Sequence, residues 1–336
     1  MIIKLISILM KNLVLVGHGY WGQNLERVIR NNKKIYNLIG VVDHKYSNND
    51  VDNMFYFNNF KDLINSKLKI DCAVISTPAT EHYHLTKMAL ENNINCLVEK
   101  PFVLKSSQAN ELFSLAKQKK LTLMIDNTFL YDNSIIELVK QVKSEKIGKI
   151  LHINFERTNL GPLREDVSAL WDLTSHDISI LLALNNVLPK DINVTGANFT
   201  SKKVADVVIT TFFQKNIFVS SIASWLHPEK TRVIKIVGEK GMILWNGMDL
   251  NQELRIYSDK KYKKSKKFND VYINLTNTKN SGYKVPYVEK SEPLDMVFKD
   301  FYKRLSKKTS NNLNQENLVK NQILILELLD KKLRLN

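Results

Sequence analysis

The chain has 336 residues, of which 44% are hydrophobic and 25% are charged, as in ordinary globular proteins. This composition excludes disorder of the whole chain, and no apolar run reaches the roughly 18 residues that a membrane span needs. The formal net charge is +15, and the densest lysine cluster lies at residues 260–267. We interpret that cluster as a solvated loop and expect no nucleic-acid partner, while an anionic partner such as a phosphorylated substrate or nucleic acid stays open as the alternative.

The first eleven residues combine lysines with a short apolar stretch and superficially resemble a signal peptide. No small-residue cleavage site follows, and residues 12–16 already form a predicted buried strand, so we reject that interpretation. Met10 is an alternative start. Cys72 and Cys96 lie in apolar runs without metal-ligand spacing. We therefore expect buried thiols, no metal and a cytoplasmic location.

The N-terminal part alternates short apolar runs with amphipathic segments. The apolar runs cover residues 13–16, 38–42, 72–76, 96–98 and 121–125. The helix-like segments cover residues 21–30, 60–64, 82–91 and 107–117. Continuous Val, Ile and Leu runs are typical of strands covered on both faces, in a parallel sheet of βαβ units. The pattern predicts an α/β fold with an N-terminal Rossmann domain at residues 10–127.

After Gly148 strand-like runs follow one another, which indicates an antiparallel sheet. These runs cover residues 149–157, 193–199, 204–213, 217–224, 232–237, 242–245 and 254–258. Helical patterns cover residues 131–145, 172–184, 294–305 and 317–333, while residues 269–292 are too irregular to assign. We expect a C-terminal α+β domain at residues 128–336, with a large, mainly antiparallel open sheet, for substrate binding and oligomerisation.

A glycine pattern opens the predicted first helix: residues 17–22 are Gly-His-Gly-Tyr-Trp-Gly, which fits G-x-G-x-x-G. Gly17 would make the tight turn, Gly19 would let the backbone approach a pyrophosphate, and Gly22 would allow close helix packing. Asp43 closes the second strand and would accept the ribose hydroxyls, which favours NAD over NADP. The two basic residues after Asp43 could soften that preference. A structural glycine turn and a methyltransferase loop are the alternatives, and the latter would favour an acid just before Gly17.

Two further segments follow predicted strands. Ser76-Thr77-Pro78 leads to His82 on the next helix, and Glu99-Lys100-Pro101 ends a later strand. With the glycine loop they resemble the Gfo/Idh/MocA (glucose-fructose oxidoreductase and inositol dehydrogenase) family over essentially the whole chain. The resemblance implies an NAD(P)-dependent dehydrogenase or reductase acting on CH–OH groups. The expected cofactor-binding residues are Gly17, Gly19, Tyr20, Trp21, Gly22, Asp43, Ser76, Thr77, Pro78, His82, Glu99 and Lys100.

The expected catalytic residues lie in two segments. Lys100 stands at a strand end, where ligands of open α/β sheets bind, and its ammonium would stabilise a developing alkoxide. Pro101 could carry a cis bond. Asp172 and His176 are four residues apart, so one helix face would hold both. Taken alone they fit a helix N-cap and a core histidine equally well; the resemblance implies that they and Lys100 form the catalytic set.

Polar residues between the C-terminal strands and the catalytic helix are candidates for substrate binding. The substrate-binding set is Lys100, Arg157, Asn159, Arg164, Asp172 and His176. Arg157, Asn159 and Arg164 could contact a polyol or an anionic group, or be surface residues. The sequence departs from the family near residues 127–131, where many members carry an arginine followed by a proline and this chain has Phe129 and Leu130.

We therefore expect hydride transfer between NAD and a secondary hydroxyl or ketone of a sugar, cyclitol or sugar derivative. His176 would be the general acid/base, Asp172 its orienting partner and Lys100 the clamp on the reacting oxygen. The alternatives are an NAD-dependent glycosidase without net redox change and a non-catalytic cofactor-binding regulator. The resemblance also implies homo-oligomers, dimers or tetramers, formed through the open face of the C-terminal sheet.

Overall fold

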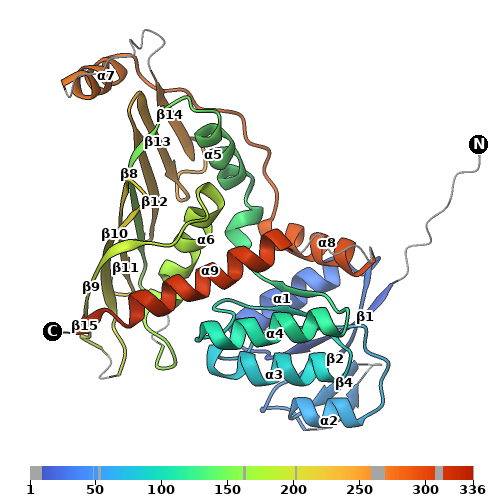
Figure 1. The fold of residues 1–336 in the computed structure, drawn as a ribbon. Coiled ribbons are helices and arrows are strands. Elements are labelled where there is room, and N and C mark those ends of the chain that lie inside the picture. The colour runs from blue at the N-terminus through green and yellow to red at the C-terminus, as the bar shows by residue number, and fades with distance from the viewer. Residues whose placement is uncertain are drawn as a thin grey trace, which may run out of the picture. The chain divides into compact units, whose positions relative to one another are not determined.

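The computed structural model describes residues 10–47, 49–51, 54–161, 164–200, 203–258, 269–306 and 313–335 (Figure 1). The lysine cluster at residues 260–267 and the stretch before Met10 lie outside this part. None of the described helices is long and apolar enough to cross a membrane. The chain forms two units, one from Met1–Thr128 with Glu292–Asn317 and one from Phe129–Ser291 with Leu318–Asn336.

The first unit contains a seven-stranded sheet in the order β3-β4-β2-β1-β5-β6-β7. Its strands are β1 (Lys11–Val16), β2 (Tyr36–Val42), β3 (Asn49–Val51), β4 (Met54–Phe57), β5 (Cys72–Ile75), β6 (Asn95–Val98) and β7 (Leu123–Ile125). The neighbouring strands pair in parallel, except that β3 runs antiparallel to β4 at the edge. β5 is buried throughout and β1 is buried from its third residue on, as continuous apolar runs predict.

Helices link these strands: α1 (Tyr20–Asn31), α2 (Phe60–Asn65), α3 (Ala79–Glu91) and α4 (Ser106–Gln118). Helix α1 packs on β1 and β2, α3 packs on β5 and β6, and α3 and α4 lie side by side (Figure 1). The chain leaves β1 in one direction along the sheet and returns through β5 in the other. Ligands of such sheets bind at this reversal, outside the carboxyl ends of the strands. Cys72 and Cys96 are free and buried, and burial raises the pKa of both thiols.

Helix α8 (Pro293–Ser306) also belongs to the first unit, although the sequence prediction placed its residues in the C-terminal domain. The helix buries Phe298 and Phe301 completely. The Tyr36 hydroxyl donates to the Phe298 carbonyl oxygen at 2.8 Å, and the two rings meet edge to face. Asn32 at the end of α1 donates to the carboxylate of Asp295 at 2.7 Å. Aromatic packing and side-chain hydrogen bonds thus join α8 to the rest of the Rossmann unit.

The second unit contains an eight-stranded sheet in the order β14-β13-β12-β8-β11-β10-β9-β15. Its strands are β8 (Ile150–Thr158), β9 (Lys190–Ala197), β10 (Val207–Gln214), β11 (Ile217–Ser224), β12 (Thr231–Gly238), β13 (Gly241–Asn246), β14 (Leu254–Ser258) and β15 (Leu333–Leu335). Five neighbouring pairs are antiparallel, and β8 with β11 and β9 with β15 are parallel. The mainly antiparallel sheet expected from consecutive strand-like runs is confirmed.

Helices of this unit lie along one face of that sheet (Figure 1). They are α5 (Asn133–Lys143), α6 (Ser175–Leu184) and most of α9 (Leu313–Asp330), whereas α7 (Asn269–Asn280) lies beside β13 and β14 at one end of the sheet. Two short elements precede α5 and α6: the 3-10 turn η1 (Thr128–Tyr131) and the π-helical turn η2 (Leu170–Thr174). The predicted helix at residues 172–184 is therefore a π turn followed by an α-helix. Wide turns of this kind occur frequently at functional sites.

Candidate functional site

The glycine loop joins β1 to α1, and the chain turns tightly there. Gly17 has a φ of +92°, which side chains rarely adopt, and a Cβ would lie 2.5 Å from the Ser76 carbonyl oxygen. At Gly22 a Cβ would lie 2.3 Å from the Gly17 carbonyl oxygen, because the helix packs directly on the turn. The packing of the protein itself therefore requires glycine at both positions.

Gly19 differs from these two glycines, since a Cβ built there would meet no atom within 4 Å. Its backbone, with a φ of −73° and a ψ of −165°, suits any residue. It precedes the first turn of α1, which has no acidic residue and no side-chain cap among the described residues. Free N–H groups at a helix N-terminus bind phosphate, and glycine lets a phosphate approach the backbone. The loop therefore fits the pyrophosphate of a dinucleotide.

Asp43 follows β2 and lies beside the glycine loop. Its Oδ2 accepts the backbone N–H of His18 at 2.7 Å, and its Oδ1 accepts that of Lys45 at 3.2 Å. Burial alone would raise the pKa of Asp43, but these two donors and the Lys45 charge outweigh it and lower the pKa. The side chain is thus a fixed carboxylate at neutral pH, where Rossmann domains hold the adenosine ribose.

The loop after β5 contains Ser76 and Thr77, and the Ser76 N–H donates to the Val16 carbonyl oxygen at 2.7 Å. Thr77 Oγ1 is buried without a hydrogen-bond partner among the described residues, as for a hydroxyl that a ligand would satisfy. His82 is buried on α3, with its ring nitrogens 2.8 Å from the Thr77 and 2.9 Å from the Pro101 carbonyl oxygens. His82 thus connects two loops, and its direct contact with the cofactor stays a prediction.

Glu99 belongs to a buried carboxyl pair at the end of β6. Its Oε1 accepts the Trp21 Nε1–H at 2.5 Å and its Oε2 accepts the Lys100 N–H at 3.1 Å. Its carboxyl is also hydrogen-bonded to that of Asp126, whose Oδ1 accepts the Thr128 hydroxyl at 2.7 Å. Two carboxyl groups can share a hydrogen bond only if one is protonated. Burial and the neighbouring acid raise the pKa of Glu99 well above its ordinary value, so we assign the proton to Glu99.

Lys100 stands directly after this acid pair and is half-buried, and its bond to Pro101 is cis as predicted. Its ammonium lies close enough to Glu99 and Asp126 to oppose the rise in the pKa of both carboxyl groups. Within the first unit, the described residues therefore bring the glycine loop, Asp43 and Lys100 to the carboxyl ends of β1, β2 and β6. Tyr20 is largely exposed at the same edge, and Pro78 begins the approach to α3.

In the second unit, Asp172 lies in the π turn η2. Its Oδ1 accepts a hydrogen bond from Arg164 at 3.3 Å, and its Oδ2 accepts the Trp225 Nε1–H at 3.1 Å. His176 is the second residue of α6 and is half-buried, and its ring contacts that of Phe129 with centroids 4.9 Å apart. The structure thus holds the Asp172 carboxylate from two sides. Its predicted orientation of the His176 ring stays a prediction.

The three predicted substrate contacts of this unit have different surroundings. Arg157 is buried, and its Nε and Nη2 lie 2.9 Å and 2.7 Å from Oδ1 of Asp177. Burial raises the pKa of Asp177, and the Arg157 charge opposes that rise. Asn159 is half-buried, and its backbone N–H donates to the Ser224 carbonyl oxygen at 3.0 Å. Arg164 donates hydrogen bonds both to Asp172 and to a nearby acid, so it helps to hold the Asp172 carboxylate in place.

Sequence reasoning missed several residues of these two sets. Asp126 directly follows β7 without any local motif, and only its hydrogen bond to Glu99 reveals it. Trp225 follows β11 as an ordinary apolar residue, yet it binds Asp172. Arg232 lies in β12 in an alternating strand, where the pattern predicts only a polar face. Phe129 was noted as a departure from the family, which is a usable signal, but its contacts could not be foreseen.

Comparisons with known proteins agree over both units. Residues 11–127 match a model described as an oxidoreductase family with an NAD-binding Rossmann fold, and residues 135–244 match the GFO/IDH/MocA C-terminal domain. A UDP-N-acetylglucosamine 3-dehydrogenase of Acidithiobacillus ferrooxidans is 25% identical over 197 residues, which cover 56% of this chain and 59% of that protein. The match therefore spans less than two thirds of that relative.

Solved structures match over nearly the whole chain. That of the same A. ferrooxidans enzyme has a TM-score of 0.73 and 18% identity, covering 96% of this chain and 99% of the other. KijD10, a 3-ketoreductase from Actinomadura kijaniata in complex with NADP, has a TM-score of 0.80 and 12% identity, covering 97% and 99%. GenD2 from gentamicin A biosynthesis, in complex with NAD, has a TM-score of 0.73 and 16% identity, covering 97% and 95%. At these identities the likeness establishes the fold.

A Rossmann unit with a glycine loop fitted to a dinucleotide, together with a second unit built on a mainly antiparallel sheet, defines a nucleotide-dependent oxidoreductase. The chain belongs to the Gfo/Idh/MocA family. The resemblance inferred from the glycine loop and the Glu-Lys-Pro segment is thereby confirmed, and the family is one of oxidoreductases.

Proposed function

We propose that the enzyme transfers a hydride reversibly between NAD and a secondary hydroxyl or ketone of a sugar, cyclitol or sugar derivative. The observation that carries the proposal is the glycine loop, where a Cβ at Gly19 would meet no atom of the described residues within 4 Å, beside the fixed carboxylate of Asp43. The relatives named above, a sugar-nucleotide dehydrogenase and a ketoreductase, support the substrate class.

NAD is the proposed cofactor, held by the loop residues and Asp43. The nicotinamide would supply or accept the hydride. Asp43 is ionised at neutral pH and would repel the 2′-phosphate of NADP, although the Lys45 ammonium donates to the His18 carbonyl oxygen at 2.6 Å and brings a positive charge to the same loop. KijD10 binds NADP and GenD2 binds NAD, so relatives use either cofactor.

Three side chains would manage the reacting oxygen and its proton. His176 would take the hydroxyl proton during oxidation and return it during reduction. Asp172, fixed by Arg164 and Trp225, would keep the helix start and the imidazole in position. Lys100 would stabilise negative charge on the oxygen as it develops. We also propose that copies of the chain associate through the sheet face opposite α5, α6 and α9 (Figure 1).

The test is NADH formation across a panel of polyols, uronic acids and sugar nucleotides, preceded by fluorescence titration with NAD and NADP. Lys100→Met should lower turnover about a hundredfold with little change in NAD affinity, since a single such donor contributes roughly 3 kcal/mol in the transition state. His176→Ala should lose most of its activity and flatten the alkaline rise in the oxidation rate.

Lys105→Met is the matched control, because Lys105 is exposed just before α4 and is assigned no role. Equal loss in both lysine variants would refute the assignment of Lys100. Substrate conversion without NADH accumulation would replace net oxidation by the transient redox cycle of an NAD-dependent glycosidase. Tighter binding of NADP would overturn the role given to Asp43.

A further inference from the structure

Two arginines stand directly opposite each other in neighbouring strands of the second unit. Arg157 of β8 pairs in register with Arg232 of β12. Both guanidinium groups also lie on the ring of Phe129, with Cζ 4.4 Å from the centroid for Arg157 and 5.4 Å for Arg232. Like charges placed opposite each other across strands destabilise a sheet. The pair therefore calls for an explanation.

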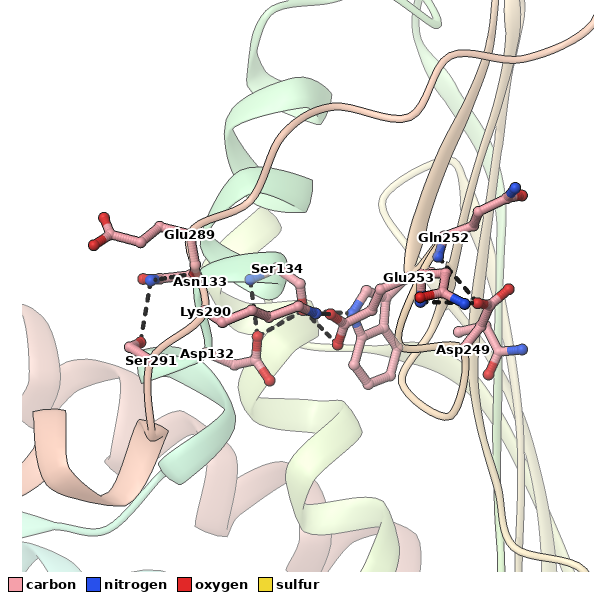
Figure 2. A network of polar contacts seen from close by, with 12 residues as sticks. Asp132, Asn133, Ser134, Asp249, Gln252, Glu253, Glu289, Lys290 and Ser291 are labelled. Atoms are coloured by element: carbon pink, nitrogen blue, oxygen red, sulfur yellow. Dashed lines mark hydrogen bonds and ion pairs between the residues drawn. The ribbon is translucent and has the colours of Figure 1, made fainter.

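Among the described residues, only one of the two guanidinium groups has an ion-pair partner. Arg157 forms its buried ion pair with Asp177. Arg232 has no ion pair with any acid in the part of the chain that the structure describes. Asp132 is the acid that raises the pKa of Arg232, but it forms no ion pair with Arg232 and its Oδ1 accepts the Ser134 N–H at 2.8 Å as the cap of α5 (Figure 2).

The surroundings of Arg232 show the excess of positive charge. Burial and the Arg157 charge lower the pKa of Arg232 to about 10, and Asp132 opposes this only in part. Lys230, two residues earlier, has its pKa lowered first by Arg232, then by burial and Arg157. Three cations thus lie close together, and among the described residues only Arg157 has a carboxylate in contact with it. An unpaired, partly buried cation of this kind is costly to hold without a ligand.

We propose that Arg232, with Lys230 at its side, binds an oxyanion of the substrate, either a phosphoryl group or a carboxylate. The planar guanidinium offers two parallel N–H donors to either group, and Asp177 holds Arg157 in place as a second, fixed charge. The inference rests on the proposed function, and it narrows the substrate class to sugar acids, sugar phosphates and sugar nucleotides.

The position of the cluster supports this assignment. The same Phe129 ring that carries both arginines also contacts His176, the proposed acid/base. The Phe129 ring also packs edge to face against Trp245, with the ring centroids 6.1 Å apart. Trp245 is held in turn by its Nε1–H, which donates to Ser134 Oγ at 2.7 Å. A substrate bound to Arg232 would thus lie against the proposed catalytic histidine on a rigid aromatic base.

Calorimetric titration of the full chain with NAD present tests the site without requiring turnover. The probes are UDP-N-acetylglucosamine, glucuronate and neutral N-acetylglucosamine. Arg232→Gln should weaken binding of the diphosphate or the carboxylate probe at least tenfold and leave the neutral sugar and NAD unchanged. If Arg232→Gln weakens binding of UDP-N-acetylglucosamine alone, the oxyanion that Arg232 binds is a phosphoryl group. If it weakens binding of glucuronate alone, the oxyanion is a carboxylate.

Arg255→Gln is the matched control, since Arg255 lies 5.5 Å over the Tyr283 ring but is already paired with Asp249. It should leave anion binding unchanged. Arg232→Gln should also raise the melting temperature of the ligand-free protein, because it removes the repulsion with Arg157; a purely structural arginine would lower it. The proposal is overturned if neither anion binds the wild type, or if both anions bind Arg232→Gln as tightly as the wild type.

Failure of this proposal is distinguishable from failure of the proposed function. If the wild type binds an anionic probe through Arg232 but forms no NADH with any member of the panel, the anion site stands and the redox assignment falls. If NADH forms with a member of the panel but Arg232→Gln binds both anionic probes as tightly as the wild type does, the redox assignment stands and the anion site falls.

Discussion

The acid pair of Glu99 and Asp126 makes the stability of the first unit depend on pH. The pKa of Glu99 is raised in the folded protein, chiefly by burial and then by Asp126. The folded state therefore holds a proton that the unfolded chain releases above its ordinary glutamate pKa. Stabilisation from this proton is complete below that pKa and is lost as the pH rises through the raised value.

Asp126→Asn should flatten this dependence, because the carboxamide can donate to an ionised Glu99 and removes the neighbouring charge. We expect the wild type to lose up to about 1.4 kcal/mol per pH unit above pH 5 relative to the variant. Melting temperatures measured from pH 5 to pH 9 check this. Glu111→Gln is the control, since Glu111 is exposed and its pKa is lowered by Lys87 and Tyr83. Parallel curves for the wild type and Asp126→Asn would contradict the shared proton.

Single residues also mark the limit of the sequence analysis. Asp43 could be placed from its distance to the glycine pattern, because that relation is local and belongs to one βαβ unit. Arg232 could not be predicted as a site residue, because its role depends on lying in register with Arg157. That register comes from the pairing of two strands that are distant in the sequence. The contacts of Asp126 and Phe129 could not be predicted for the same reason, because their partners lie on other elements.

At the scale of elements, the three glycines of the loop serve different needs. Gly17→Ala and Gly22→Ala would each push a methyl group into a backbone carbonyl, and we expect a loss of about 1 to 3 kcal/mol in stability. Gly19→Ala meets no atom and should fold with nearly normal stability. It should nevertheless weaken NAD binding at least about tenfold, because the methyl group would occupy the space left for the pyrophosphate.

Denaturant unfolding and cofactor titration of the three variants separate these effects. The expected pattern is stable but weakly binding for Gly19→Ala, and destabilised for the other two. Normal NAD affinity in Gly19→Ala would show that the phosphates lie elsewhere. The order of these three glycines was predictable from the pattern, whereas the π turn η2 was not, because its extra residue per turn leaves no mark in the apolar periodicity.

At the scale of the whole molecule, the eight-stranded sheet carries apolar residues on a face away from its buried side chains. Ile209 is 49% exposed, Phe213 40% and Phe218 37%. The last two are paired in register, with ring centroids 5.3 Å apart. Val208, Phe212 and Val219 alternate with them and are buried. Such a face is expected to be covered by a second copy of the chain.

A double variant tests this expectation. Phe213→Glu with Phe218→Glu should convert the assembly to monomers, as measured by light scattering after size exclusion. Leu250→Glu is the control, because Leu250 is 76% exposed outside the sheet strands and should not affect association. A wild type that is already monomeric, or a double variant that keeps the wild-type mass, would refute the interface.

The chain passes between the two units three times, after residues 128, 291 and 317, and α8 joins the first unit only after the second sheet has been traced. During synthesis the Rossmann strands therefore leave the ribosome long before the helix that covers Tyr36. Until residue 306 has emerged, the aromatic surface around Tyr36 is exposed to solvent or is shielded by other contacts. A shortened chain ending near residue 128 would keep the glycine loop but lack Phe298 and Phe301, so we expect a cofactor domain cut at that boundary to be less stable than the first unit in the full chain.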